Sequence, residues 1–183
     1  MIAVSAMRVF FILCLIFVSC KDKKYLRIEE EKESGSMISL RDFSRLSYTK
    51  TGDLEWKLLG KESYIFPKEN RTVVYGFQFY QYDGGKYKSF LTGERGEINH
   101  TDKSVVLDGD VRLKTEEGRQ LHSESLKYNL EDKTLSTDDN VVIYSEGTTI
   151  RGKGLRADRG LNKYTVLHPT AITVGGSNPL KDK

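Results

Sequence analysis

The sequence has 183 residues, 29 basic and 26 acidic, with a formal net charge of +3 at pH 7. This length predicts one domain, with or without a tail. The charges of both signs are interspersed, so the clustered basic face that nucleic-acid binding requires is missing. Aromatic residues make up 10% of the chain, 10 Tyr and 8 Phe among them, a content that favours β-strands in a soluble protein. The composition therefore argues against a disordered chain and against a nucleic-acid partner.

The N-terminus begins with an apolar run over residues 9–18, preceded by a basic residue. A run of about ten residues is shorter than the ~20 that span a bilayer, and it has the length of a secretory signal core. The sequence leaves open whether translation starts at Met1 or Met7. Both cysteines, Cys14 and Cys20, lie in or next to this run. The folded part therefore forms no disulfide and no zinc–thiolate site, and we expect no metal and no cofactor.

The apolar run is followed by the tetrapeptide Phe17-Val18-Ser19-Cys20. It resembles the lipobox of bacterial lipoproteins, although Phe17 stands where a Leu is usual. The resemblance implies a lipoprotein-type signal peptide over residues 1–19 and acylation of Cys20, which would hold the chain on a membrane. An uncleaved signal anchor over residues 2–18 and ordinary cleavage are the alternatives. All three place the domain outside the cytoplasm.

The segment that follows, residues 20–38, is rich in charged residues and ends near Ser34-Gly35-Ser36. Such a composition is typical of a tether. We expect the folded domain over residues 39–175. Residues 176–183, which contain Gly176 and Pro179, are expected to form a disordered tail.

The first part of the domain shows the period-2 alternation of apolar and polar residues that predicts β-strands. We expect strands over residues 38–51, 54–58, 61–66, 72–82 and 87–92. The 72–82 segment is the most aromatic. Strict alternation would place four of its side chains on one face, namely Val73, Tyr75, Phe77 and Phe79. It would place Val74, Gly76, Gln78, Tyr80 and Tyr82 on the other.

The last third of the chain repeats with a period of thirty residues. Lys103, Lys133 and Lys163 follow one another at this spacing, and so do Val111, Val141 and Ala171. Self-similarity at this period indicates units that must stack to bury an apolar face. Each unit predicts a strand–turn–strand–turn–strand, with Gly118 and Gly147 in turns. Together with the earlier segments, the sequence predicts about fifteen short antiparallel strands.

Residues that carry chemistry are sparse. The three histidines, His100, His122 and His168, occupy different positions in their units, so nothing in the pattern brings them together. Four acidic residues are expected at turns, where a carboxylate caps backbone donors: Asp102, Asp132, Asp138 and Asp139. No catalytic triad with a recognisable local context is present. The sequence therefore predicts a protein that is not an enzyme.

Two segments carry a resemblance to a known family: Asp108-Gly109-Asp110-Val111-Arg112-Leu113 and Gly152-Lys153-Gly154-Leu155-Arg156-Ala157-Asp158. Together with the N-terminal anchor and the tether, they resemble the lipopolysaccharide export family LptC and its LptA and OstA-like relatives, over residues 40–175. The resemblance implies an all-β fold, an open antiparallel β-jellyroll with V-shaped twisted sheets around an apolar groove. In this chain the jellyroll would be built partly from the ~30-residue repeats.

The resemblance also implies a function. The chain would bind lipopolysaccharide or a related glycolipid and pass it from an inner-membrane ABC transporter to an LptA-type periplasmic bridge protein. It would act in the periplasm, anchored to the inner membrane by an N-terminal lipid or signal anchor. The alternatives are a surface or periplasmic lipoprotein with a structural or adhesive β-repeat domain, and an enzyme acting on envelope glycans.

Acyl chains need a dry apolar groove, and unpaired sheet edges can add a partner's strand. The hypothesis assigns the groove to nine apolar residues: Phe77, Phe79, Val105, Leu107, Val111, Leu113, Leu135, Val141 and Ile143. It assigns the N-terminal edge, facing the transporter, to Phe43, Leu46 and Tyr48. It assigns the C-terminal edge, facing the bridge protein, to Ala171, Ile172 and Val174.

Overall fold

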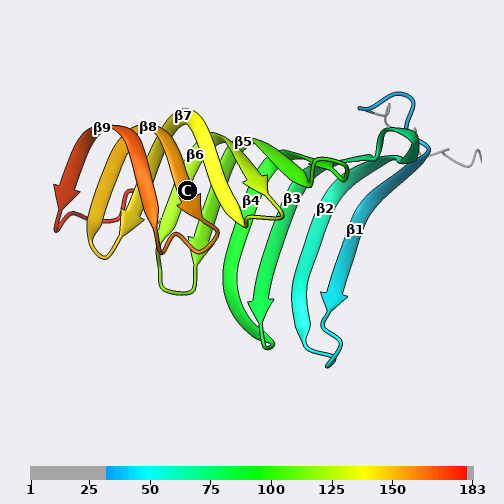
Figure 1. The fold of residues 1–183 in the computed structure, drawn as a ribbon, viewed down its shortest axis with the longest axis horizontal. Helices are drawn as coiled ribbons and strands as arrows, with labels where there is room; N and C mark the ends of the chain where they lie inside the picture. The colour runs from blue at the N-terminus through cyan, green and yellow to red at the C-terminus, as the bar shows by residue number, and fades with distance from the viewer. Residues whose placement is uncertain (1–31, 181–183) are drawn as a thin grey trace, which may run out of the picture. The chain divides into compact units, whose positions relative to one another are not determined.

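The structure is a computed structural model that describes residues 32–180, and its folded unit starts at Glu33. The signal peptide, Cys20 and most of the tether predicted from the sequence lie outside the described residues. The described part forms one antiparallel sheet in which each strand pairs with the next along the chain (Figure 1). Its nine strands are β1 (Ile38–Tyr48), β2 (Leu54–Phe66), β3 (Arg71–Asp83), β4 (Lys86–Asn99), β5 (Ser104–Thr115), β6 (Gln120–Asn129), β7 (Thr134–Ser145), β8 (Thr148–Asp158) and β9 (Tyr164–Val174).

The all-β class is confirmed, but the predicted number of strands is wrong. Nine long strands replace the fifteen short ones. Each thirty-residue unit supplies two strands rather than three, and the expected strands 54–58 and 61–66 are joined in β2. Two of the turns expected within the repeat units would fall at polar pairs of residues. These pairs lie inside strands instead: Gly109-Asp110 is in β5 and Asp138-Asp139 is in β7. The pairing register shifts at both places. They are bulges, in which an extra residue bends a strand without ending it.

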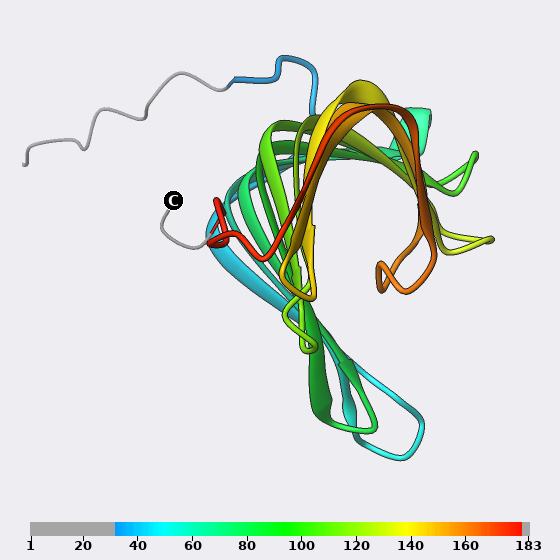
Figure 2. The same ribbon diagram turned by 90° about the vertical axis from the view of Figure 1, so that its left-hand side faces the viewer.

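Bulges recur halfway along consecutive strands. The register shifts once between β4 and β5, and again at each pairing through to β8 and β9. In β5 the bulge is made by Gly109 and Asp110, with φ of +76° and +47°, which glycine and aspartate adopt more readily than most residues. Because a bulge bends its strand and increases the local twist, the sheet arches over itself (Figure 2). The side chains of its concave face meet one another.

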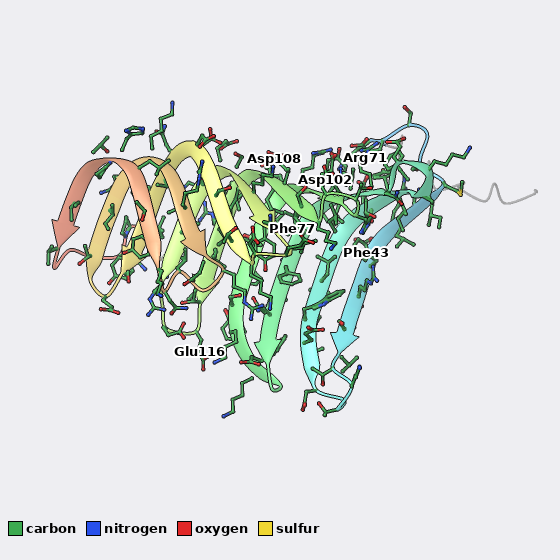
Figure 3. The ribbon with its side chains drawn as sticks, in the orientation of Figure 1. Phe43, Arg71, Phe77, Asp102, Asp108 and Glu116 are labelled. Atoms are coloured by element: carbon green, nitrogen blue, oxygen red, sulfur yellow. The ribbon has the colours of Figure 1, made fainter. Side chains whose placement is uncertain are left out.

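Two of the turns between the repeat units have the same construction. Asn99 and Asn129 each accept hydrogen bonds at Oδ1 from the backbone amides two and three residues ahead, at 2.8–3.1 Å. Lys103 and Lys133 close these turns with φ of +50° and +57°. An Asn that caps local donors in this way favours a tight turn. Figure 3 shows Asp102 of the first of these turns at the opposite end of the strands from Glu116.

Strand β3 does not keep one alternation along its length. Val73 and Tyr75 pack with Tyr64 and Phe66, in a cluster separate from the one that holds Phe77 and Phe79. The expectation that these four β3 side chains share a face is therefore wrong. Gly76 lies between the two pairs with φ of +58°, a conformation that interrupts the alternation of an extended strand and that glycine adopts without strain.

The main core lies inside the arch. We call its thirteen buried residues the interior cluster: Val74, Phe77, Leu107, Val111, Leu113, Leu121, Leu126, Leu135, Val141, Ile143, Leu155, Ala157 and Leu161. Partly buried residues pack against it, among them Phe43, Leu58, Phe79, Leu91 and Val105. Eleven of the thirteen come from β5–β8 and the loop that follows β8. The repeat units therefore supply most of the core.

Candidate functional site: the apolar interior

All nine residues that the sequence assigns to a groove lie in or against the interior cluster. Seven are members of the cluster and have exposed fractions of 5% or less, and Phe79 and Val105 are partly buried beside it. The structure therefore brings these residues together on one continuous apolar surface. In this conformation the side chains of the seven cluster members are almost fully covered.

The facing of these side chains follows from the alternation within each strand. On β7, Val141 and Ile143 are buried at 2% and 0% exposure, whereas the residue between them, Val142, is only partly buried. Leu121 on β6 lies directly opposite Ile143. Such cross-strand apolar pairs stabilise the sheet, and here they extend the apolar surface from one strand to the next.

Sequence reasoning missed several members of the interior cluster. Leu155 and Ala157 alternate within the Gly152–Asp158 motif and are buried, so the period-2 pattern could have identified them. Leu126 lies within the register shift of β6, between Ser123 and Lys127, where the alternation changes phase. Leu161 lies in a polar loop, and no local pattern distinguishes it from an exposed turn residue such as Leu130, which is 42% exposed.

An open hollow of about 860 Å³ lies where β6–β9 meet the β8–β9 loop. Its lining includes two members of the interior cluster, Leu135 and Ala157, and three basic residues, Lys127, Arg156 and Lys163. Arg156 also reaches Asp138 at 3.2 Å and the backbone oxygen of Thr137; neither of these two residues lines the hollow. Lys127 and Arg156 are exposed and lie next to buried residues of the interior cluster along their strands, so their side chains lie on the opposite face of the sheet from that cluster. The hollow thus gathers three cationic residues, an arrangement suited to an anionic group.

The residues assigned to partner edges do lie on the two edge strands of the sheet, β1 and β9. Leu46 and Tyr48 on β1 are 43% and 58% exposed, and Ile172 and Val174 on β9 are 63% and 78% exposed. Ala171 is exposed as well. Phe43 differs, because its ring packs against the interior cluster.

Charged groups in the described part lie in networks near the surface. Asp110 accepts hydrogen bonds from Arg112 at 2.9–3.0 Å and contacts His122 at 2.8 Å. The bonds from Arg112, and secondarily the one with His122, hold the pKa of Asp110 below its usual value. Burial, followed by the hydrogen bond that its hydroxyl donates to Glu33, raises the pKa of Tyr75. These networks tie strands together and do not converge on the interior.

The structure keeps the three histidines apart. His122 contacts Asp110, His100 contacts Thr72 at 3.1 Å, and His168 lies on the edge strand β9. Asp138 and Asp139 lie at the β7 bulge rather than at a turn, so that expectation is wrong. Residues 32–180 contain no group of three or more His, Cys, Asp or Glu side chains placed to hold a metal. They also contain no helix long and apolar enough to cross a membrane.

Comparison with known proteins identifies a solved structure that shares this fold. No curated protein matches the chain. Among solved structures, LptH from Pseudomonas aeruginosa matches with a TM-score of 0.51 and 14% identity, over 68% of this chain and 90% of LptH. LptH is described as the LptA homologous periplasmic component of the lipopolysaccharide transport device; at this identity the likeness shows a shared fold.

A family model also matches, and it covers more of the chain. The model described as "Lipopolysaccharide-assembly, LptC-related" extends over residues 7–173. Its span includes all nine strands but for the last residue of β9. The chain therefore belongs to the LptC-related family of lipopolysaccharide-assembly proteins.

Proposed function

We propose that this protein carries lipopolysaccharide or a related glycolipid through the periplasm by binding its acyl chains inside the arched sheet. The observation that carries the proposal is the interior cluster, a continuous apolar surface within a sheet whose two edge strands do not pair with each other. A sheet with unpaired edges can open, unlike a closed barrel. Membership in a lipopolysaccharide-assembly family supplies the ligand class.

The hollow beside the β8–β9 loop suits the other half of such a ligand. Phosphorylated sugar headgroups are anionic, and Lys127, Arg156 and Lys163 line the hollow. Charge-assisted hydrogen bonds from such groups to phosphate are about twice as strong as neutral ones. The headgroup would stay in this hollow, beside the β8–β9 loop, while the acyl chains lie inside the arch. Binding and release involve no bond making or breaking, so the activity is transport rather than catalysis.

Transfer needs partners at both ends of the sheet. The exposed backbone and apolar side chains of an edge strand are a template for adding a strand from another protein. We assign Leu46 and Tyr48 on β1 to the inner-membrane ABC transporter. We assign Ala171, Ile172 and Val174 on β9 to an LptA-type bridge protein. Phe43 would support the N-terminal edge from inside.

The location of the protein follows from its N-terminal segment. We propose that Cys20 is acylated and that the lipid holds the domain at the periplasmic face of the inner membrane. A Cys20→Ala variant should lose metabolic labelling by a fatty-acid analogue and leave the membrane fraction. Retention in the membrane without labelling would favour an uncleaved signal anchor instead.

Site-specific photocrosslinking in cells tests the groove. A photoreactive residue at Val141, which is buried in the interior cluster, should form an adduct with lipopolysaccharide. The same residue at Val142, its neighbour on the other face of β7, is the matched control and should form none.

The two positions separate the possible results. An adduct at Val141 alone supports the interior as the acyl-chain site. An adduct at Val142 alone would move the glycolipid to the convex face. Absence of adducts at both positions, in a well-expressed and folded protein, would favour a structural or adhesive lipoprotein and overturn the proposed function.

A further inference from the structure

The β8–β9 loop, residues 159–163, is built differently from the two equivalent turns. The β4–β5 and β6–β7 turns have four residues between strands, and the β8–β9 loop has five. The extra residue turns Leu161 inward, with φ of +53° and no exposed surface. In the β6–β7 turn, Leu130 stays 42% exposed. The loop therefore places an apolar side chain in the interior cluster that the preceding turn leaves outside.

This loop reaches across the mouth of the arch. Arg119 lies in the β5–β6 turn, at the end of the strands opposite to the β8–β9 loop. Its Nη1 nevertheless donates a hydrogen bond to Oδ1 of Asn162 at 2.9 Å. Strands β6–β8 run between these two turns, so the contact joins the two limbs of the arch. Figure 2 shows the β8–β9 loop, in orange, curling in toward the opposite limb.

The loop is held together from within. The carboxylate of Asp158 accepts hydrogen bonds from the backbone amides of Gly160, Asn162 and Lys163 at 2.9–3.0 Å. These bonds connect residues of the loop and its own strand, so they can persist if the loop swings away from the other limb. Such a movement would break the Arg119–Asn162 bond and withdraw Leu161 from the interior cluster.

We propose that the β8–β9 loop is a latch on the interior, in which Leu161 occupies an acyl-chain subsite and the Arg119–Asn162 hydrogen bond holds it there. The inference rests on the proposed function, because it names the element that an acyl chain displaces. The position of the loop supports it: Asn162 and Lys163 line the same hollow as Lys127 and Arg156. A glycolipid headgroup in the hollow would thus lie next to the loop that carries Leu161.

If the loop is a latch, weakening it should increase glycolipid capture by a measurable factor. Loss of one hydrogen bond typically shifts an equilibrium by about two- to tenfold. Removing the Arg119 side chain should therefore raise the population of the open state, and with it glycolipid capture at limiting concentration, by about two- to tenfold. Arg159 lies in the same loop with an exposed side chain, which makes Arg159→Ala a matched control.

The experiment uses the full-length chain, with a photoreactive residue at Val141, mixed with limiting lipopolysaccharide micelles. We expect a higher adduct yield from Arg119→Ala than from the unsubstituted chain, and an unchanged yield from Arg159→Ala. Leu161→Ser should also raise the yield, whereas the same change at the exposed Leu130 should not. If Leu161→Ser does not fold, as judged by its circular dichroism, Arg119→Ala decides the question, because Arg119 lies in a surface turn.

The possible failures are distinguishable. An adduct at Val141 whose yield is the same in Arg119→Ala and Arg159→Ala overturns the latch and leaves the proposed function standing. A lower yield from a folded Arg119→Ala variant overturns the latch as well, because the contact would then favour binding. Absence of any adduct in all of the chains overturns the proposed function and the latch together.

Discussion

The two halves of the sheet bury their concave faces to different extents. In β5–β8 most cluster residues are aliphatic and nearly inaccessible, such as Leu121, Ile143 and Leu155 at 0–1% exposure. In β1–β4 most of the residues facing the cluster are only partly buried, among them Leu58 and Phe79. The C-terminal half therefore provides most of the packing energy. The N-terminal half leaves more of its concave apolar side chains partly exposed.

The sharpest test of this difference compares one truncation in each half. Ile143→Ala removes a fully buried side chain and should lower the free energy of unfolding by about 2–5 kcal/mol. Leu58→Ala removes a partly buried one, for which we expect roughly 1 kcal/mol. Urea unfolding of both variants gives the two values. Similar losses would mean that the halves are equally well packed.

Close packing around glycines gives a second comparison. A Cβ at Gly152 would lie 2.5 Å from the backbone oxygen of His168, whereas at Gly60 it would lie 2.5 Å from the Phe43 ring. The Phe43 ring can rotate away from an added methyl group, whereas the backbone of a paired strand cannot move. Gly152→Ala should therefore lower the free energy of unfolding by about 1–3 kcal/mol, and Gly60→Ala should lower it by less. Thermal unfolding measures both. Adding Phe43→Leu should relieve the Gly60 variant, and no relief would mean that the ring is not the obstacle.

The repeat turns should behave alike in spite of the different halves they join. Asn99→Ala and Asn129→Ala each remove an acceptor of two backbone amides, and each should cost about 1 kcal/mol. Chemical denaturation of both variants tests the equality. Asn129→Asp keeps an acceptor oxygen and should stay close to the unsubstituted chain. A large difference between the two Asn→Ala variants would show that one turn is supported by its surroundings.

The smallest expected effect concerns the charge at the β5 bulge. Asp110 has a lowered pKa, chiefly because Arg112 bonds its carboxylate. The contribution of Asp110 to the free energy of unfolding is therefore fully present above the unfolded-state pKa of ~3.9. It disappears as the pH falls through the lower pKa of the folded state. The group is half exposed, so Asp110→Asn should cost less than about 1 kcal/mol at pH 7. Unfolding midpoints of the two proteins should converge in acid, and a difference that persists there would contradict this origin.

Several features of the molecule were predictable because they depend on neighbours in sequence. The turns at Asn129-Leu130-Glu131-Asp132-Lys133 and at Gly84-Gly85 form where the residue types demand them. Val141 and Ile143 share a face because they lie two residues apart within an uninterrupted stretch of strand. The family resemblance also rests on local motifs. These features need only the period of a strand and the chemistry of a turn.

The sequence by itself determined an all-β chain with capped turns, a thirty-residue repeat and a family membership. Only the tertiary structure decided which polar pairs end a strand and which bend it, since Gly109-Asp110 has the composition of a turn but pairs as a bulge. Only the arch brings Arg119 to Asn162 and gives Leu161 an apolar place to occupy. The Arg119–Asn162 bond joins residues 43 positions apart, and long-range packing, rather than local propensity, determines such contacts.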